Sequence, residues 1–158
     1  MSDDMPHDHG SQAPAGRVRS DRILIADDDS AMRSLLRAAL VRAGFEVEEA
    51  RDGIEVLQLV RAVRYGERPP IHVMVSDVWM PGRSGLDLLQ SLQELGVAIP
   101  VILITAFGTD EVHEQGCLGG ACAVIDKPFS LETLLDHIRK CLPGHDTHTT
   151  RPQGDPIA

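Results

Sequence analysis

VMVSDVWMPGRSGLDLL, residues 73–89, contains in one stretch the two kinds of segment from which the fold is built. Its first residues belong to the apolar run IHVMVS (71–76), whose lack of polar alternation is typical of a strand covered on both faces. Asp77 follows, and a Pro-Gly turn then leads into 86–95, where leucines recur at helical spacing. A buried strand that ends on a carboxylate and precedes an amphipathic helix predicts one unit of an α/β sheet.

The same alternation of apolar runs and amphipathic stretches continues in both directions along the chain. Strict alternation of strands and helices requires parallel pairing through right-handed crossovers. We therefore predict an α/β fold with three layers, a doubly wound five-stranded parallel sheet of the flavodoxin-like kind, whose polar sites lie at the carboxyl ends of the strands. The other predicted strands are 22–26, 45–49, 101–105 and 122–125, and the other predicted helices are 30–42, 53–63, 110–118 and 130–142.

The length of 158 residues fits one folded domain with tails. Residues 1–20 and 143–158 mix Gly, Pro, His and other polar residues without apolar periodicity. This composition predicts two disordered tails around a folded unit at 21–142. Because few residues follow Leu142, we expect the folded unit to stand alone, without an attached output domain.

Composition argues against several classes of protein. The formal net charge is -9, whereas binding to nucleic acid relies on Lys and Arg, so we expect no direct contact with nucleic acid. No apolar run approaches the roughly 20 residues that span a bilayer, and the acidic start does not resemble a signal peptide, so we expect a cytoplasmic protein without membrane insertion. The three cysteines, Cys117, Cys122 and Cys141, lack paired spacing, and we expect them to be buried free thiols.

Polar side chains gather where the predicted strands end. Asp27 and Asp28 follow the first strand, Asp77 follows the third, Thr105 closes the fourth, and Lys127 lies just beyond the fifth. Because these ends converge in a parallel sheet, the carboxylates would repel one another unless a cation such as Mg²⁺ or Mn²⁺ offset their charge. One carboxylate can then accept a phosphoryl group, while a hydroxyl and an ammonium share the charge on its oxygens.

At these residues the chain resembles the response-regulator receiver domains of two-component signal transduction. The resemblance covers about residues 21–141, and its segments stand in the family's order at the predicted strand ends. The segments are ILIADDDSAMR (23–33), VMVSDVWMPGRSGLDLL (73–89), VILITAFG (101–108) and VIDKPFSLETLL (124–135).

The resemblance implies a role for each acidic residue. Asp77 is the implied phospho-acceptor, which forms 4-aspartylphosphate in a magnesium-dependent reaction. Asp28 is implied to bind the metal directly and Asp27 to hold it through water. Asp77 and the backbone carbonyl of Trp79 complete the implied set of protein ligands.

The resemblance also implies how the switch works. Thr105 would bond the phosphate and report its arrival, and Lys127, whose peptide bond to Pro128 is commonly cis, would pair with a phosphate oxygen. The family often places Tyr or Phe at the position of Val124, so output switching is expected to differ from the aromatic version. The implied donor is a sensor histidine kinase or histidine phosphotransfer protein. The chain is expected to catalyse only its own phosphorylation and dephosphorylation and to signal to an unknown protein target.

Two other functions fit parts of the pattern. Asp27 and Asp29 form the D-x-D of haloacid-dehalogenase-type phosphatases, with Asp27 as nucleophile, but the chain is short for that family and offers only helix and tail acids after Lys127. The second alternative is a receiver-like docking module that takes no phosphate, and Val124 is its only support. Asp29 and Ser30 are better explained as helix-capping or exposed residues.

Overall fold

The structure is a computed structural model that describes residues 20–142, so the predicted tails, apart from residue 20, lie outside the described residues. Strands and helices alternate throughout, as the sequence pattern predicts. In chain order the elements are β1 (Arg22–Ala26), α1 (Ser30–Arg42), β2 (Glu46–Ala50), α2 (Gly53–Arg64), β3 (Val73–Asp77), α3 (Gly85–Glu94), β4 (Val101–Thr105), α4 (Asp110–Leu118), β5 (Ala123–Asp126) and α5 (Leu131–Cys141).

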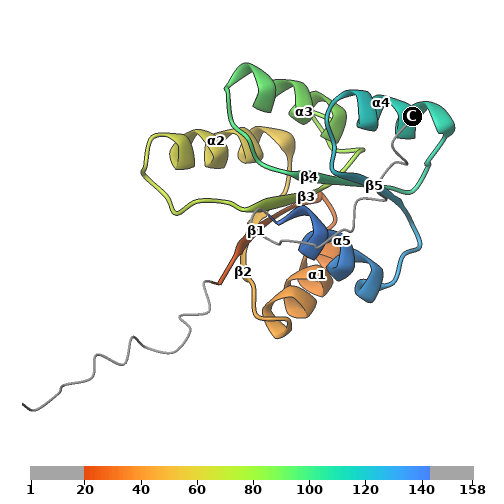
Figure 1. Cartoon of the computed structure of the whole chain (residues 1–158), viewed down its shortest axis with the longest axis horizontal. Helices are drawn as coiled ribbons and strands as arrows, with labels where there is room; N and C mark the ends of the chain where they lie inside the picture. Colours follow the sequence, from red (N-terminus) through yellow and green to blue (C-terminus); the bar gives the residue numbers. More distant parts are fainter. Residues whose placement is uncertain (1–19, 143–158) are drawn as a thin grey trace, which may run out of the picture.

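The five strands form one parallel sheet in the order β2-β1-β3-β4-β5. Helices α2, α3 and α4 cover one face, and α1 and α5 cover the other (Figure 1). This strand order is that of the flavodoxin-like doubly wound fold, and it confirms the predicted three layers. The order reverses at β1, so the space beyond the carboxyl ends of β1 and β3 is where this fold places a site.

Two hydrophobic clusters, one on each face of the sheet, explain the continuous apolar strands. Along β1, Leu24 points to the side of α2, α3 and α4, whereas Ile23 and Ile25 point to the side of α1 and α5. All three side chains are fully buried, and burial of each such side chain contributes about 1.5–3 kcal/mol. The clusters fix the register of the strands and therefore the positions of the polar residues that follow them.

Each helix begins after a polar capping residue. The Asp29 side chain accepts hydrogen bonds from the backbone N–H groups of Ala31 and Met32, which confirms its predicted capping role. Ser84 and Asp87 form a reciprocal capping box at the start of α3. These caps satisfy N–H groups that a helix leaves unpaired, so the loops at the strand ends turn sharply into their helices.

The predicted bounds differ from the structure by one or two residues, in helices as well as in strands. β2 begins one residue later than predicted, and β3 covers Val73–Asp77 rather than 71–76, because pairing with β1 starts at Ile23 opposite Val73. The peptide bond between Lys127 and Pro128 is cis, as expected. Within residues 20–142, no helix is both long enough and apolar enough to cross a membrane.

The expectation of three buried free thiols is wrong. Cys122 and Cys141 form a disulfide, and Cys117 is free but exposed. The reason is three-dimensional: Cys122 directly precedes β5, Cys141 ends α5, and the packing of α5 against the sheet brings their Cα atoms to 6.3 Å. This distance lies within the range that a disulfide spans.

Candidate functional site

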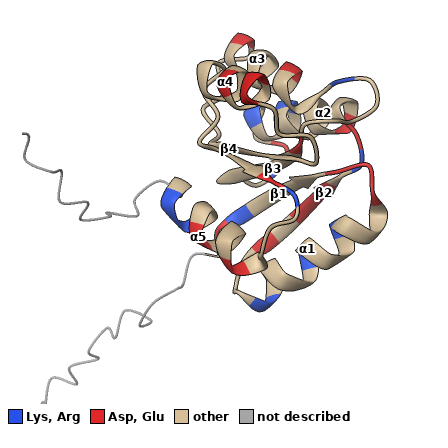
Figure 2. Cartoon of the chain, turned by 90° about the vertical axis from the view of Figure 1, so that its right-hand side faces the viewer, with Lys and Arg blue, Asp and Glu red and all other residues tan. Residues whose placement is uncertain are grey.

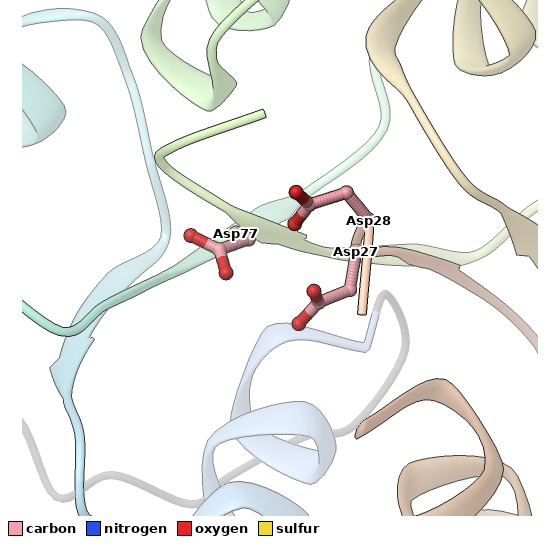
Figure 3. A group of neighbouring side chains, drawn as sticks. All are labelled: Asp27, Asp28 and Asp77. Atoms are coloured by element: carbon pink, nitrogen blue, oxygen red, sulfur yellow. The ribbon is translucent and has the colours of Figure 1, made fainter. Parts of the chain in front are cut away.

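The carboxylates of Asp27, Asp28 and Asp77 converge at the carboxyl edge of the sheet (Figure 3). Asp27 and Asp28 directly follow β1, and Asp77 is the last residue of β3, the strand paired with β1. One oxygen from each of the three side chains lies within 4.8 Å of the others. The structure thus brings together the three acidic residues that the sequence singles out.

Asp77 is held by two donors. Its Oδ1 accepts a hydrogen bond from the backbone N–H of Trp79 at 2.9 Å, and its Oδ2 accepts one from Lys127 Nζ at 3.0 Å. Asp77 is 8% exposed, so the residue is largely shielded from solvent at the end of its strand. The Trp79 contact places the peptide of that residue beside the acceptor, while its indole is exposed.

Asp27 is the more enclosed member of the acid pair after β1. Its Oδ1 accepts from the backbone N–H of Asp29 at 2.9 Å, and Lys127 Nζ lies 3.9 Å from its Oδ2. Its backbone carbonyl accepts a hydrogen bond from Arg33 Nη1 at 2.7 Å, and Arg33 is paired in turn with Glu49. Sequence reasoning missed Arg33; the signal is a basic residue one turn into the helix that follows the acidic run.

The three consecutive aspartates after β1 serve different purposes. Asp27 is a buried member of the cluster, Asp28 is an exposed member of it, and Asp29 turns away to cap α1. Only the first two share the cluster with Asp77. Of the three, Asp28 is therefore the carboxylate that reaches both the cluster and solvent.

Thr105 lies beside this edge as the last residue of β4, fully buried. Its Oγ1 accepts a hydrogen bond from the backbone N–H of Phe107 at 3.1 Å, and its carbonyl accepts one from the backbone N–H of Lys127 at 2.8 Å. Thr105 thus joins the loop after β4 to the loop that carries Lys127. That the Thr105 hydroxyl bonds a phosphate, as the resemblance implies, stays a prediction.

Val124 packs closely against α4. A Cβ built at Gly116 would lie 2.6 Å from Val124 Cγ2, so the missing side chain at Gly116 leaves the room that Val124 fills. Val124 is half-buried in β5 and contacts the cluster on the α4 side of the sheet. The helix and the strand are therefore fitted to a small aliphatic residue at this position.

Burial is the main cause that raises the pKa of Asp27 above its ordinary value. The neighbouring negative charges of Asp77 and Asp28 act in the same direction, and the hydrogen bond from Asp29 and the ammonium of Lys127 oppose them. The cluster therefore carries unfavourable negative charge that a cation at this edge would offset.

In metal-free protein, the raised pKa of Asp27 makes stability fall with pH. The folded state holds the proton more tightly than the unfolded chain, whose Asp titrates near 3.8, so the free energy of unfolding decreases as pH rises from that value through the raised pKa. We expect Asp27→Asn to be more stable than the natural protein at pH 7 in EDTA, by about 1.4 kcal/mol for each unit of elevation. Urea unfolding measures the difference, which should vanish below about pH 3.8. Equal stabilities at pH 7 would contradict it.

The donor set of the cluster suits a hard divalent cation. All three side chains offer carboxylate oxygens, the ligands that Mg²⁺ and Mn²⁺ prefer, and the negative charges of the three outnumber the single ammonium of Lys127. A carboxylate held between an ammonium and a cation site is also placed to act as a nucleophile towards phosphorus.

Comparisons with known proteins agree with this geometry. The family model of the response regulator receiver domain matches residues 23–139. The chain is 36% identical over 134 residues to the response regulator MprA of Mycobacterium avium, covering 85% of this chain and 54% of that protein. It is 39% identical over 121 residues to MprA of Mycobacterium leprae, covering 77% of this chain and 50% of that protein. The chain thus spans about half the length of the curated relatives it matches.

Solved structures show the same fold. The receiver domain of Francisella response regulator 1452 matches with a TM-score of 0.69 and 27% identity, covering 77% of this chain and 95% of that one. The chemotaxis protein CheY4 of Vibrio cholerae matches with a TM-score of 0.68 and 30% identity, covering 77% and 98%. The strand order, the acidic cluster and these matches lead to one conclusion: the chain belongs to the family of response regulator receiver domains of two-component signalling.

Proposed function

We propose that the protein is a phospho-accepting switch in which Asp77 takes a phosphoryl group from a phosphohistidine of a sensor histidine kinase or histidine phosphotransfer protein. A carboxylate oxygen of Asp77 attacks phosphorus, the P–N bond breaks, and the histidine nitrogen keeps the electron pair. The observation that carries this proposal is the position of Asp77 at the end of β3, 3.0 Å from the ammonium of Lys127 and within the cluster of Asp27 and Asp28.

Asp27, Asp28 and Asp77 would hold a Mg²⁺ or Mn²⁺ ion, and the backbone carbonyl of Trp79 is the predicted further ligand. Support comes from the oxygen donors and from the excess negative charge of the cluster. Bound there, the ion would offset the negative charge of the phosphoryl group. Asp28 is the exposed ligand, so ions from solvent reach the cluster from its side.

Lys127 and Thr105 act on the transferred group in this proposal. Lys127 already donates a hydrogen bond to Asp77 Oδ2, so after the transfer its ammonium could bind a negatively charged phosphoryl oxygen instead. The Thr105 hydroxyl would bond another such oxygen. Because Thr105 Oγ1 holds the backbone N–H of Phe107, this new bond would alter the loop that leads into α4.

The signal would then pass through α4 and β5 to a protein partner. Val124 packs closely against Gly116 of α4, so a shift of the loop before α4 would change the packing at this contact. In this proposal no aromatic ring has to rotate, so the switching would differ from that of receivers with Tyr or Phe at the position of Val124.

We further propose that the chain catalyses only its own phosphorylation and dephosphorylation, and that hydrolysis of the aspartyl phosphate resets the switch. We also propose that the whole protein works in the cytoplasm and passes its signal on through contacts with other proteins. In the view of Figure 2, Lys and Arg are spread over several elements, among them α1 and α5, rather than gathered in one stripe. This distribution and the net charge of -9 weigh against direct contact with nucleic acid.

The rival phosphatase function would need Asp29 as a second acid beside the nucleophile Asp27. The Asp29 carboxylate instead caps α1, with Oδ1 2.9 Å from the backbone nitrogen of Ala31. A docking module that takes no phosphate would not need Lys127 to face Asp77. The contacts of Asp29 and Lys127 therefore favour the phospho-acceptor.

The test is incubation with Mg²⁺ and acetyl phosphate, followed by intact mass measurement. The natural protein should gain one phosphoryl group, and Asp77→Asn should gain none. Asp136→Asn, which removes an exposed carboxylate of α5, is the matched control and should be phosphorylated normally. No gain in the natural protein would favour the docking module, and hydrolysis of a generic phosphate ester by Asp77→Asn would favour the phosphatase.

A further inference from the structure

A disulfide closes the last unit of the fold. Cys122 and Cys141 are 19 residues apart, and the loop that their bond closes contains β5, the Lys127 loop and α5. Because Cys122 directly precedes β5 and Lys127 directly follows it, the bond lies at the end of β5 opposite to Lys127. The phospho-acceptor site and the disulfide thus occupy the two ends of one β5–α5 unit.

The two sulfur-bearing residues differ in exposure. Cys122 is exposed on the turn before β5, whereas Cys141 is 9% exposed and belongs to the core cluster with Leu134 and Ile138. Thiol–disulfide exchange requires access of a thiolate to one of the two sulfurs. Cys122 therefore offers the point of attack, and Cys141 would be the leaving thiol.

Contacts other than the disulfide also hold β5 and α5 in place. Leu134 and Ile138 anchor α5 with 1% and 0% exposure, and β5 is paired with β4 along its length. The backbone N–H of Cys122 donates to the carbonyl of Val101 at 2.7 Å, so the turn is held without the sulfur. A reduced Cys141 would be a small apolar side chain in an apolar cluster, which is a common environment for a free cysteine.

We propose that Cys122 and Cys141 are a reversible redox modification site that fastens the end of α5 to the start of β5. A dithiol reductant opens it: one thiolate attacks Cys122 Sγ, Cys141 leaves as a thiolate and takes a proton, and the second thiol of the reductant releases Cys122. A small-molecule or protein disulfide closes it by the reverse exchange, taking up the two electrons. Where the proposed cytoplasmic location holds, reducing conditions make such a bond a redox-sensing one rather than a permanent one.

The site controls how firmly the last turn of α5 is held. Closing a loop of this length restricts the unfolded chain, so oxidation should raise the Tm by about 10 °C relative to the reduced protein. The phosphoryl chemistry at the opposite end of β5 uses neither cysteine. Oxidised and reduced protein should therefore accept phosphate from acetyl phosphate alike.

The test counts thiols in the full chain. After treatment with oxidised glutathione and then with iodoacetamide in denaturant, the protein should carry one added group, on Cys117, which is an alkyl or a glutathionyl group. Protein first incubated in the folded state with dithiothreitol, which is then removed, should gain three alkyl groups. Cys117→Ser removes the exposed free thiol, so this variant should gain no alkyl group after oxidation and two after reduction. It should keep the difference in Tm between oxidised and reduced protein. Cys122→Ser should show the same Tm with and without dithiothreitol.

Three results would overturn the proposal. They are three alkyl groups after oxidation, a bond that dithiothreitol opens only in denatured protein, and loss of the disulfide in Cys117→Ser. The acetyl phosphate reaction is measured on the same samples. Its failure would remove the proposed phospho-acceptor function alone, whereas failure of the thiol count would remove the redox site alone.

Discussion

Lys127→Met is expected to slow phosphorylation by acetyl phosphate about 100-fold. The ammonium lies 3.0 Å from Asp77 Oδ2 and 3.9 Å from Asp27 Oδ2. In the proposed reaction it would offset the negative charge that grows on the phosphoryl oxygens. Methionine keeps an unbranched stem of similar length and removes only the charge and its hydrogen bonds. The rate is measured by intact mass at a fixed Mg²⁺ concentration.

The chain supplies its own control for this experiment, because it has only two lysines. Lys140 is exposed in the last turn of α5, and Lys140→Met should react at the rate of the natural protein. Lys127→Arg should not restore the rate, because the broad planar guanidinium of a longer side chain does not replace the compact ammonium. A rate for Lys127→Met within a few-fold of normal would remove the lysine from the mechanism.

Mg²⁺ is expected to stabilise the natural protein, and Asp28→Asn is expected to abolish most of that stabilisation. An ion that binds only the folded state adds about 2.7 kcal/mol at 100 times its Kd. Asp28 is exposed, so its replacement should leave the packing intact while removing a proposed ligand and a charge from the cluster. Urea unfolding with and without Mg²⁺ measures both quantities.

Asp29→Asn is the matched control for the Mg²⁺ experiment. It alters the next aspartate along the chain, but Asn still caps a helix, and Asp29 does not belong to the cluster. The variant should retain the full response to Mg²⁺. An equal loss in the Asp28 and Asp29 variants would show that the general negative charge of the run, rather than the cluster, attracts the ion.

Much of the fold follows from the sequence because each strand and helix has a clear local pattern. The apolar runs around Leu24, Met74 and Leu103 predict strands covered on both faces, and the two core clusters bear this out. Strand bounds are less predictable, since pairing decides where a strand starts. β3 thus extends to Asp77, the residue that the prediction placed just beyond its end.

The acidic cluster was also predictable, because parallel strands bring their carboxyl ends together. Contacts across separate elements were not. The hydrogen bond from Arg33 to the carbonyl of Asp27 and the close fit of Val124 to Gly116 depend on how helices pack on the sheet. The link between Cys122 and Cys141 has the same origin, since their spacing in the sequence carries no sign of contact.

The strand order brings together residues that are far apart in the sequence, and this affects the chain during its synthesis. Asp77 lies midway between Asp27 and Lys127, fifty residues from each, and the three meet only when β1, β3 and the segment after β5 have been placed. A chain still emerging from the ribosome would carry the aspartates without the ammonium that balances them. The site is therefore complete only after Lys127 has left the ribosome, and a shorter nascent chain would lack the positive charge that balances the aspartates.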